Sequence, residues 1–211
     1  MHAPIAIAMM LAGCAASTTS VADAGTDARA NDAGLDVMSP DTHCDLLPEP
    51  RATPTLMAGF AENDPAHGFA PPMMTGGDPI GMWVFDHGTF WIDTTANTMF
   101  NRFASSVSGT AWIAITATEF RLDYDLTITL AQTAAGTIVQ HNLTRVRARW
   151  RLDREQIEPI GLVCGESNPS PVGDPGRVTF TRRDATHLTL TTEVPQPTGT
   201  TIIVLEGTLA P

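Results

Sequence analysis

The segment from Phe120 to Leu130 most narrowly limits what this chain can fold into, because its apolar side chains recur at every second residue. A period of two places alternate side chains on opposite faces of a β-strand. One face then carries the apolar set, and the other carries threonine and charged residues. Such a strand is typical of an antiparallel sheet with one face packed on a core. The core-facing side chains of this segment are expected to be Phe120, Leu122, Tyr124, Leu126, Ile128 and Leu130.

Most of the chain after residue 80 shows the same character. Val, Ile, Thr and aromatic residues alternate between closely spaced turn residues, and no stretch has the 3.6-residue apolar stripe of a long helix. A short helix or helical turn is expected over 96–106, and Asp86-His87-Gly88 is expected to form a hairpin tip. Strands are expected over 80–85, 89–95, 110–118, 120–130, 137–152, 157–163, 177–182, 187–193 and 201–208.

The segment 137–152 changes its apolar phase. Val139 and Leu143 share one parity, and Val146 and Trp150 share the other. A β-bulge near Thr144 would produce this change. The turn into this strand is expected at 133–136, with Gly136 taking a positive φ. This hairpin would place Leu126 opposite Leu143, Tyr124 opposite Val146, Leu122 opposite Ala148 and Phe120 opposite Trp150.

Four arginines, at 145, 147, 149 and 151, share the polar face of this segment. In the expected register, Asp125 lies opposite Arg145 and Asp123 lies opposite Arg147. Ion pairs on a solvated face contribute only about 0–1 kcal/mol each, so the arginines are interpreted as a solvated ladder.

The region before the β-rich part is different in composition. Residues 15–43 are mainly Ala, Asp, Gly, Thr and Ser, and such a segment buries too little apolar surface to fold. The whole chain has a net charge of −11, which argues against a role in nucleic-acid binding, because that role needs a basic surface.

At the N-terminus, the short apolar run 5–11 ends in Leu11-Ala12-Gly13-Cys14. The run is too short to span a bilayer, which needs about 20 residues. This motif resembles the lipobox of bacterial lipoproteins. The resemblance implies removal of residues 1–13 and attachment of diacylglycerol and an N-acyl chain such as palmitate to Cys14. The alanines that follow Cys14 resemble those of lipoproteins sorted to the outer membrane. We therefore expect a signal peptide over 1–13, a lipid-anchored disordered linker over 14–43 and a β-domain over 44–211 in the cell envelope.

Lipidation of Cys14 would leave Cys44 and Cys164 as an even pair. Disulfides form in the oxidising compartments to which exported proteins go. A disulfide between Cys44 and Cys164 is therefore predicted.

The start of the β-rich region adds a second resemblance. Gly81-Met82-Trp83 resembles the Gly-x-Trp motif on the first strand of lipocalin-like domains. The resemblance implies an eight-stranded barrel whose Trp83 plugs the closed end against a basic residue of a late strand, here Arg182 or Arg183. We expect an antiparallel, lipocalin-like barrel of eight to nine strands, with a β-sandwich as the alternative. The expected interior consists of Trp83, Trp112, Phe120, Leu122, Tyr124, Leu126 and Trp150.

Motifs of catalysis are not found in the sequence: there is no Gly-x-Ser-x-Gly elbow, His-Glu-x-x-His, P-loop or dinucleotide fingerprint. We therefore expect a monomeric protein that is not an enzyme and holds no metal and no cofactor other than its acyl chains. Its expected partners are a lipid membrane, through the anchor, and a small apolar ligand inside the barrel. The alternative is a structural or protein-interaction module of the envelope, with a filled barrel and no ligand.

Overall fold

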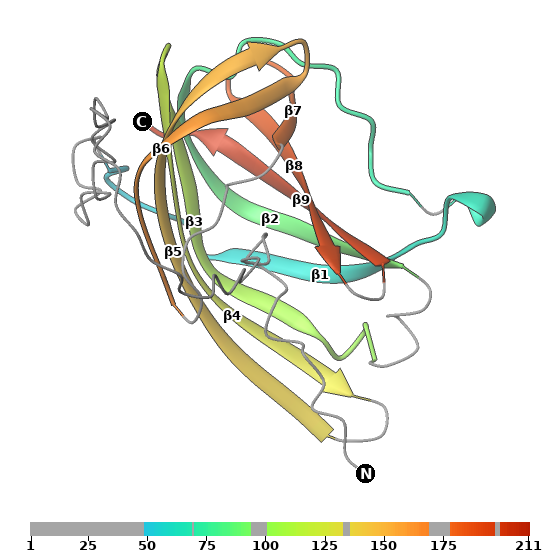
Figure 1. The fold of residues 1–211 in the computed structure, drawn as a ribbon. Helices are drawn as coiled ribbons and strands as arrows, with labels where there is room; N and C mark the ends of the chain where they lie inside the picture. The colour runs from blue at the N-terminus through green and yellow to red at the C-terminus, as the bar shows by residue number, and fades with distance from the viewer. Residues whose placement is uncertain (1–48, 69, 94–100, 133–135, 169–177, 197–198) are drawn as a thin grey trace, which may run out of the picture.

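The computed structural model describes residues 49–68, 70–93, 101–132, 136–168, 178–196 and 199–211. The expected signal peptide, Cys14, the linker and Cys44 lie outside the described residues. One nine-stranded sheet makes up the described part, with a single 3-10 turn, η2, over Pro65–His67 (Figure 1). Its strands are β1 (Leu56–Asn63), β2 (Gly81–Asp93), β3 (Ser106–Ile115), β4 (Glu119–Gln132), β5 (Gly136–Asp153), β6 (Gln156–Asn168), β7 (Val178–Arg182), β8 (His187–Gln196) and β9 (Gly199–Leu209).

The sheet closes on itself. Its strands follow one another in chain order from β1 to β9, and β2 also pairs with β9, from Trp83–Leu209 to Trp91–Ile202. Figure 1 shows the strands curving around a common interior. The predicted all-β class is confirmed, and closure of a single sheet gives a β-barrel-like ring in place of two stacked sheets.

Strand β1 makes the sheet mixed. It runs parallel to the second half of β2, from Met57–His87 to Asn63–Asp93, and its first residues pair antiparallel with β3. It therefore fills the space where β2 and β3 separate. The expectation of a wholly antiparallel sheet is wrong, and a strand lies within 44–79, where none was expected. The missed signal is the period-two row of Leu56, Ala58 and Phe60, which is short and interrupted by small residues.

Strand β2 is continuous where a hairpin tip was expected at Asp86-His87-Gly88. Its pairing with β9 shifts register between Phe85 and His87, which marks a β-bulge. Before the bulge β2 pairs with β3, and after it β2 pairs with β1. A bulge bends a strand and increases its twist. The Asp-His-Gly sequence therefore marks a bend within one strand, not a reversal of the chain.

The expected register between β4 and β5 is wrong. These strands pair without any shift from Glu119–Arg149 to Gln132–Gly136, so Tyr124 lies opposite Thr144 and Leu122 lies opposite Val146. The bulges occur instead between β5 and β6, after Arg147 and after Arg149. An unbroken ladder keeps the backbone hydrogen bonds between β4 and β5. It leaves Val139 and Leu143 on the outer side, so the stability gained from the ladder exceeds what burying these two side chains would add.

Two glycines are required by the backbone. Gly136 opens β5 with φ 88°, which confirms its predicted positive φ, while residues 133–135 of that turn lie outside the described residues. Gly109 has φ 149° and pairs with both β1 and β4. A Cβ there would lie 2.0 Å from the backbone oxygen of Asp125, so no larger residue fits without moving β4.

The region expected as a short helix, 96–106, lies partly outside the described residues. Its described part, 101–105, is a turn closed by the backbone bond from Ala104 N–H to the Asn101 carbonyl. Strand β3 then begins at Ser106, earlier than the expected 110–118.

Candidate functional site

The interior of the ring is the candidate site, and Trp83 near the start of β2 is part of its packed core. This side chain is fully buried, and its indole N–H donates to the Pro79 carbonyl at 2.8 Å. The guanidinium carbon of Arg182 on β7 lies 5.4 Å from the ring centroid, within cation–π range. Arg182 also donates to the Asp78 carbonyl at 2.9 Å. The expected contact between Trp83 and a basic residue of a late strand is therefore present, and the residue is Arg182.

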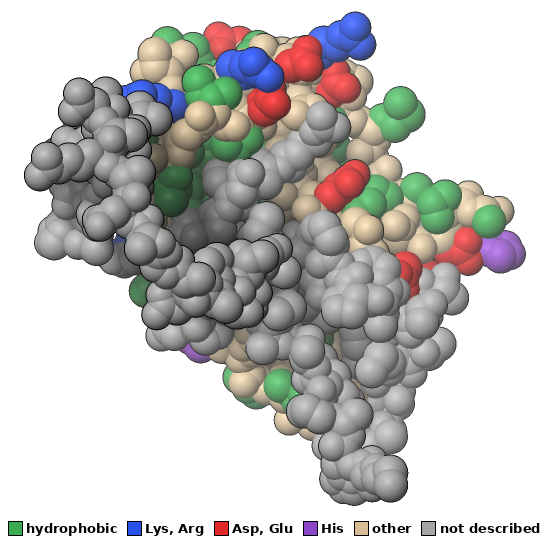
Figure 2. All heavy atoms as spheres, in the orientation of Figure 1, with side chains coloured by type: hydrophobic (Ala, Val, Ile, Leu, Met, Phe, Trp, Pro, Cys, Tyr) green, Lys and Arg blue, Asp and Glu red, His purple; other side chains and the backbone are tan. Residues whose placement is uncertain are grey.

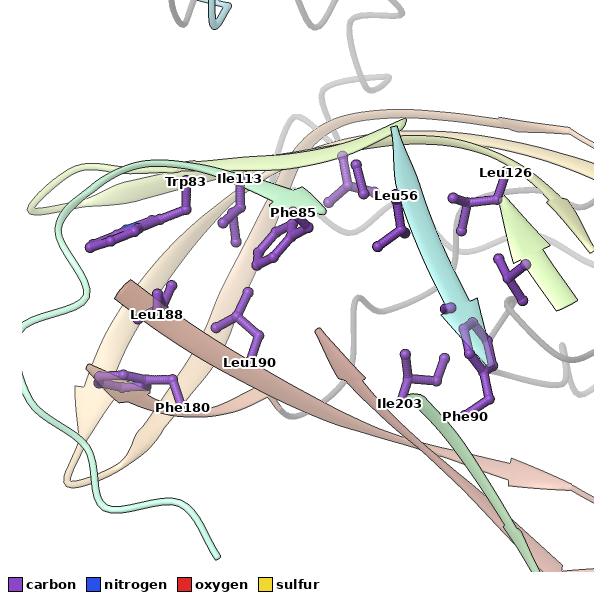
Figure 3. Packing of buried hydrophobic residues seen from close by; sticks show 14 of the residues in the cluster. Leu56, Trp83, Phe85, Phe90, Ile113, Leu126, Phe180, Leu188, Leu190 and Ile203 are labelled. Carbon is purple, nitrogen blue, oxygen red and sulfur yellow. The ribbon is translucent and has the colours of Figure 1, made fainter. Parts of the chain in front are cut away.

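Large side chains from opposite walls of the ring pack together with Trp83. Figure 3 shows Trp83, Phe85 and Ile113 pointing inward from β2 and β3, toward Phe180, Leu188 and Leu190 from β7 and β8. Of the predicted interior residues, Trp83, Phe120, Leu126 and Trp150 are buried in this single cluster, and Leu122 and Tyr124 are partly buried against it. These six predictions agree with the packing.

Trp112 is the exception, because it points away from the interior. It packs with Val84 and Ala114 in a separate cluster on the outer side of the sheet. Ala111 and Ile113 take the inward positions on β3, so the residue between them must point outward. The prediction of Trp112 as an interior residue is wrong, and the odd-numbered parity of β3 is the signal that would have placed it correctly.

Arg121 covers Trp112 on this outer side and is itself buried, with 1% of its side chain exposed. Its guanidinium carbon lies 4.7 Å from the Trp112 ring centroid. Its Nη2 donates to Glu49 Oε1 at 2.7 Å and to Asp123 Oδ2 at 3.2 Å. Burial raises the pKa of the Asp123 carboxyl, against the opposing effects of Arg121 and Arg145.

The predicted partners in the arginine ladder also change with the register. Arg145 pairs with Asp123 at 3.2 Å, and Arg147 pairs with Glu119 at 2.6 Å. Asp125 pairs with His141, not with Arg145. The face is only partly solvated, because Arg147 and Glu119 are both largely buried. Figure 2 shows acidic and basic side chains next to one another along the upper edge of that view.

A cavity is lined by residues of β3, β4, β6, β7, β8 and β9. Its volume is about 60 Å³, and Thr191 and Thr192 are its only polar lining residues within the described ranges. An apolar cavity of about 150 Å³ holds a benzene molecule. A cavity of about 60 Å³ therefore has room for one end of a ligand but not for a whole ligand as large as benzene. The apolar lining comes mainly from Ile113, Phe120, Leu122, Leu190, Ile203 and Leu205.

A polar patch on the inner face of β5 consists of Gln140, Asn142 and Thr144, and it was not expected from the sequence. Asn142 is 4% exposed and lies opposite the buried Leu126. Its Oδ1 accepts a hydrogen bond from Gln140 Nε2 at 2.8 Å. Its Nδ2 is buried and has no hydrogen-bond acceptor among the residues that the structure describes. Burial raises the pKa of the nearby Tyr124 hydroxyl, which is hydrogen-bonded to the Thr144 side chain.

A second hollow, of about 180 Å³, lies on the outer side where β2, β8 and β9 meet, and residues lining it include Asp86, His87, Arg183, His187 and Glu206. The adjacent Asp184 accepts hydrogen bonds from the Thr186 backbone N–H at 2.7 Å and the His187 backbone N–H at 2.9 Å. The Thr186 backbone N–H, the His187 ring and the Thr186 hydroxyl hold the pKa of Asp184 well below its usual range. Asp184 therefore caps the β7–β8 turn as a carboxylate and does not supply a proton, because a general acid needs a raised pKa.

The remaining predicted features concern metal, membrane and cysteine. Among the described residues, no group of three or more His, Cys, Asp or Glu side chains is placed to hold a metal ion. Within the same ranges, no helix has the length and apolar character needed to cross a membrane. Cys164 is buried on β6, while Cys44 lies outside the described residues, so their disulfide stays a prediction.

No protein-family model matches this chain, and no curated protein or solved structure matches it significantly.

Proposed function

We propose that this protein is a lipid-anchored lipoprotein of the bacterial envelope that binds a small, largely apolar ligand inside its closed sheet. The apolar cavity beside Leu122 carries the binding part of the proposal. The Leu11-Ala12-Gly13-Cys14 motif carries the anchor. Closure of the sheet around Trp83 and the stacking of Arg182 on that ring support a lipocalin-like architecture. Outer-membrane sorting is proposed from the alanines after Cys14.

The anchor is tested by Cys14→Ser in the full chain, expressed with its N-terminal segment in a bacterial host. The unchanged protein is expected to enter the detergent phase on phase separation, because two or three acyl chains give stable membrane attachment. Cys14→Ser is expected to move the protein to the aqueous phase. Cys44→Ser is the matched control and should partition as the unchanged protein does. Equal partitioning of the Cys14→Ser and unchanged proteins would contradict the anchor.

Ligand binding is tested with n-decane and with a variant that fills the cavity. We expect one end of n-decane to enter the cavity and to shift the methyl NMR signals of Ile113 and Ile203, because these side chains line it. Leu122→Trp places a larger side chain in the same space and should abolish the shifts. Its matched control is Leu143→Trp on the outer side of β5, which should leave them unchanged. Shifts that persist in Leu122→Trp would place decane elsewhere on the protein.

The alternative function is a filled envelope module that carries no ligand. One observation favours it: the buried side chains of the interior leave a cavity of only about 60 Å³. If decane produces no shifts in the unchanged protein, the interior is a packed core and the alternative function is preferred.

A further inference from the structure

Asn142 is the observation that extends the proposed function. A buried amide group without a partner costs free energy, so buried polar groups in proteins are nearly always hydrogen-bonded. The Nδ2 group of Asn142 is buried and has no acceptor among the described residues, although its Oδ1 is already held by Gln140 at 2.8 Å. An N–H group can only donate, so the missing partner must be a hydrogen-bond acceptor.

This group faces the same interior as the cavity. Asn142 lies opposite Leu126, and Leu122, which lines the cavity, is four positions earlier on the same face of β4. At about 3.3 Å per residue, the two positions are about 13 Å apart along the strand. Tyr124 lies between them. An elongated molecule that lay along this face, past Tyr124, would touch the cavity lining with one end and Asn142 with the other.

The surroundings of Asn142 indicate that this molecule is neutral. Its neighbours on the inner face of β4 and β5 are Tyr124, Leu126, Gln140 and Thr144, and none of them is a charged side chain. Burial raises the pKa of Tyr124, so its hydroxyl keeps its proton at neutral pH. A charged group placed here would lose its hydration without gaining an opposite charge.

We propose that the interior binds a neutral amphiphile whose hydrogen-bond acceptor lies against Asn142 Nδ2 and whose apolar end enters the cavity beside Leu122. This inference rests on the proposed ligand-binding function and specifies the chemical class of the ligand. The acceptor gives the ligand its orientation, and the apolar end supplies most of the buried surface.

The test compares 2-decanone with n-decane, which differ by one carbonyl acceptor. Binding is measured by isothermal titration calorimetry on the full chain carrying Cys14→Ser, so that no attached acyl chain competes for the interior. The preference for 2-decanone over decane, taken as the ratio of their Kd values, should fall about tenfold when Asn142 is replaced by Leu. Asn142→Asp, which keeps the shape of the side chain, should have the same effect at a pH where its carboxyl is ionised, because a carboxylate only accepts hydrogen bonds. His141→Leu, on the outer face of the same strand, is the matched control and should leave the ratio unchanged.

Each outcome decides a different point. A ratio that is the same in Asn142→Leu, Asn142→Asp and the His141→Leu control would overturn the role of Asn142 and leave the proposed function standing. Tighter binding of decanoate than of 2-decanone would overturn the neutral class of ligand. Binding of neither decane nor 2-decanone to the unchanged interior would overturn the proposed function together with this inference. Circular dichroism confirms that both Asn142 variants are folded before the ratios are compared.

Discussion

Trp83→Ala is expected to lower the free energy of unfolding by about 3–5 kcal/mol, the usual cost of truncating a fully buried aromatic side chain. Trp83 has no exposed surface and packs in the main core cluster. The change also leaves the Pro79 carbonyl without the indole N–H that lies 2.8 Å away, and it removes the ring on which Arg182 stacks. Chemical denaturation followed by circular dichroism measures the loss.

Two further variants separate the contributions at this position. Trp83→Phe keeps an aromatic ring but removes the N–H donor, and it is expected to cost less than the alanine change. Trp91→Ala, on the same strand but on its outer face, is the matched control and is expected to cost about 1 kcal/mol, because Trp91 is only half-buried. Equal losses for Trp83→Ala and Trp91→Ala would show that the buried Trp83 contributes no more to stability than a tryptophan on the outer face of the same strand.

The sequence was sufficient to predict the class of fold, because period-two alternation is a local property. The rows on β4 and on β8 and β9 are regular enough to identify strands without tertiary information. The position of β1 was not predictable in the same way. Its pairing with both β2 and β3 depends on where those two strands separate, and that separation is a property of the closed sheet.

The sequence predicted the apolar residues of the candidate site but not its polar ones. Trp83, Phe120 and Leu126 were assigned to the interior because apolar residues on one face of a strand are buried in a core. The same rule missed Asn142, because it assigns a polar residue on a strand to the solvated face. The rule also favoured a bulge near Thr144, which would have kept Val139 inside. The continuous ladder between β4 and β5 decided the register instead, and it placed the polar patch in the interior.

Arg121→Met is expected to lower the free energy of unfolding by about 3 kcal/mol, because it removes one partner of a buried ion pair and leaves the other buried. Asp123 would keep Arg145 at 3.2 Å but lose the guanidinium of Arg121. The stacking of that guanidinium on Trp112 is lost as well. Arg151→Met removes a solvent-exposed ion pair with Glu158 on the same sheet and is the matched control, expected to leave stability unchanged within error.

The pH dependence of the loss identifies its cause. Burial holds the pKa of Asp123 above its ordinary value of 3.8, so the folded state binds this proton more readily than the unfolded state. The contribution of Asp123 to the free energy of unfolding therefore rises as pH falls through the raised pKa, because protonation removes the cost of burying the carboxylate. Removing Arg121 increases that cost, so the difference between the unchanged protein and Arg121→Met should shrink as the pH is lowered toward 3.8. Arg121→Met combined with Asp123→Leu should recover part of the loss at neutral pH and should show no such dependence. A loss that is constant with pH and persists in the double variant would instead come from the packing of Arg121 on Trp112.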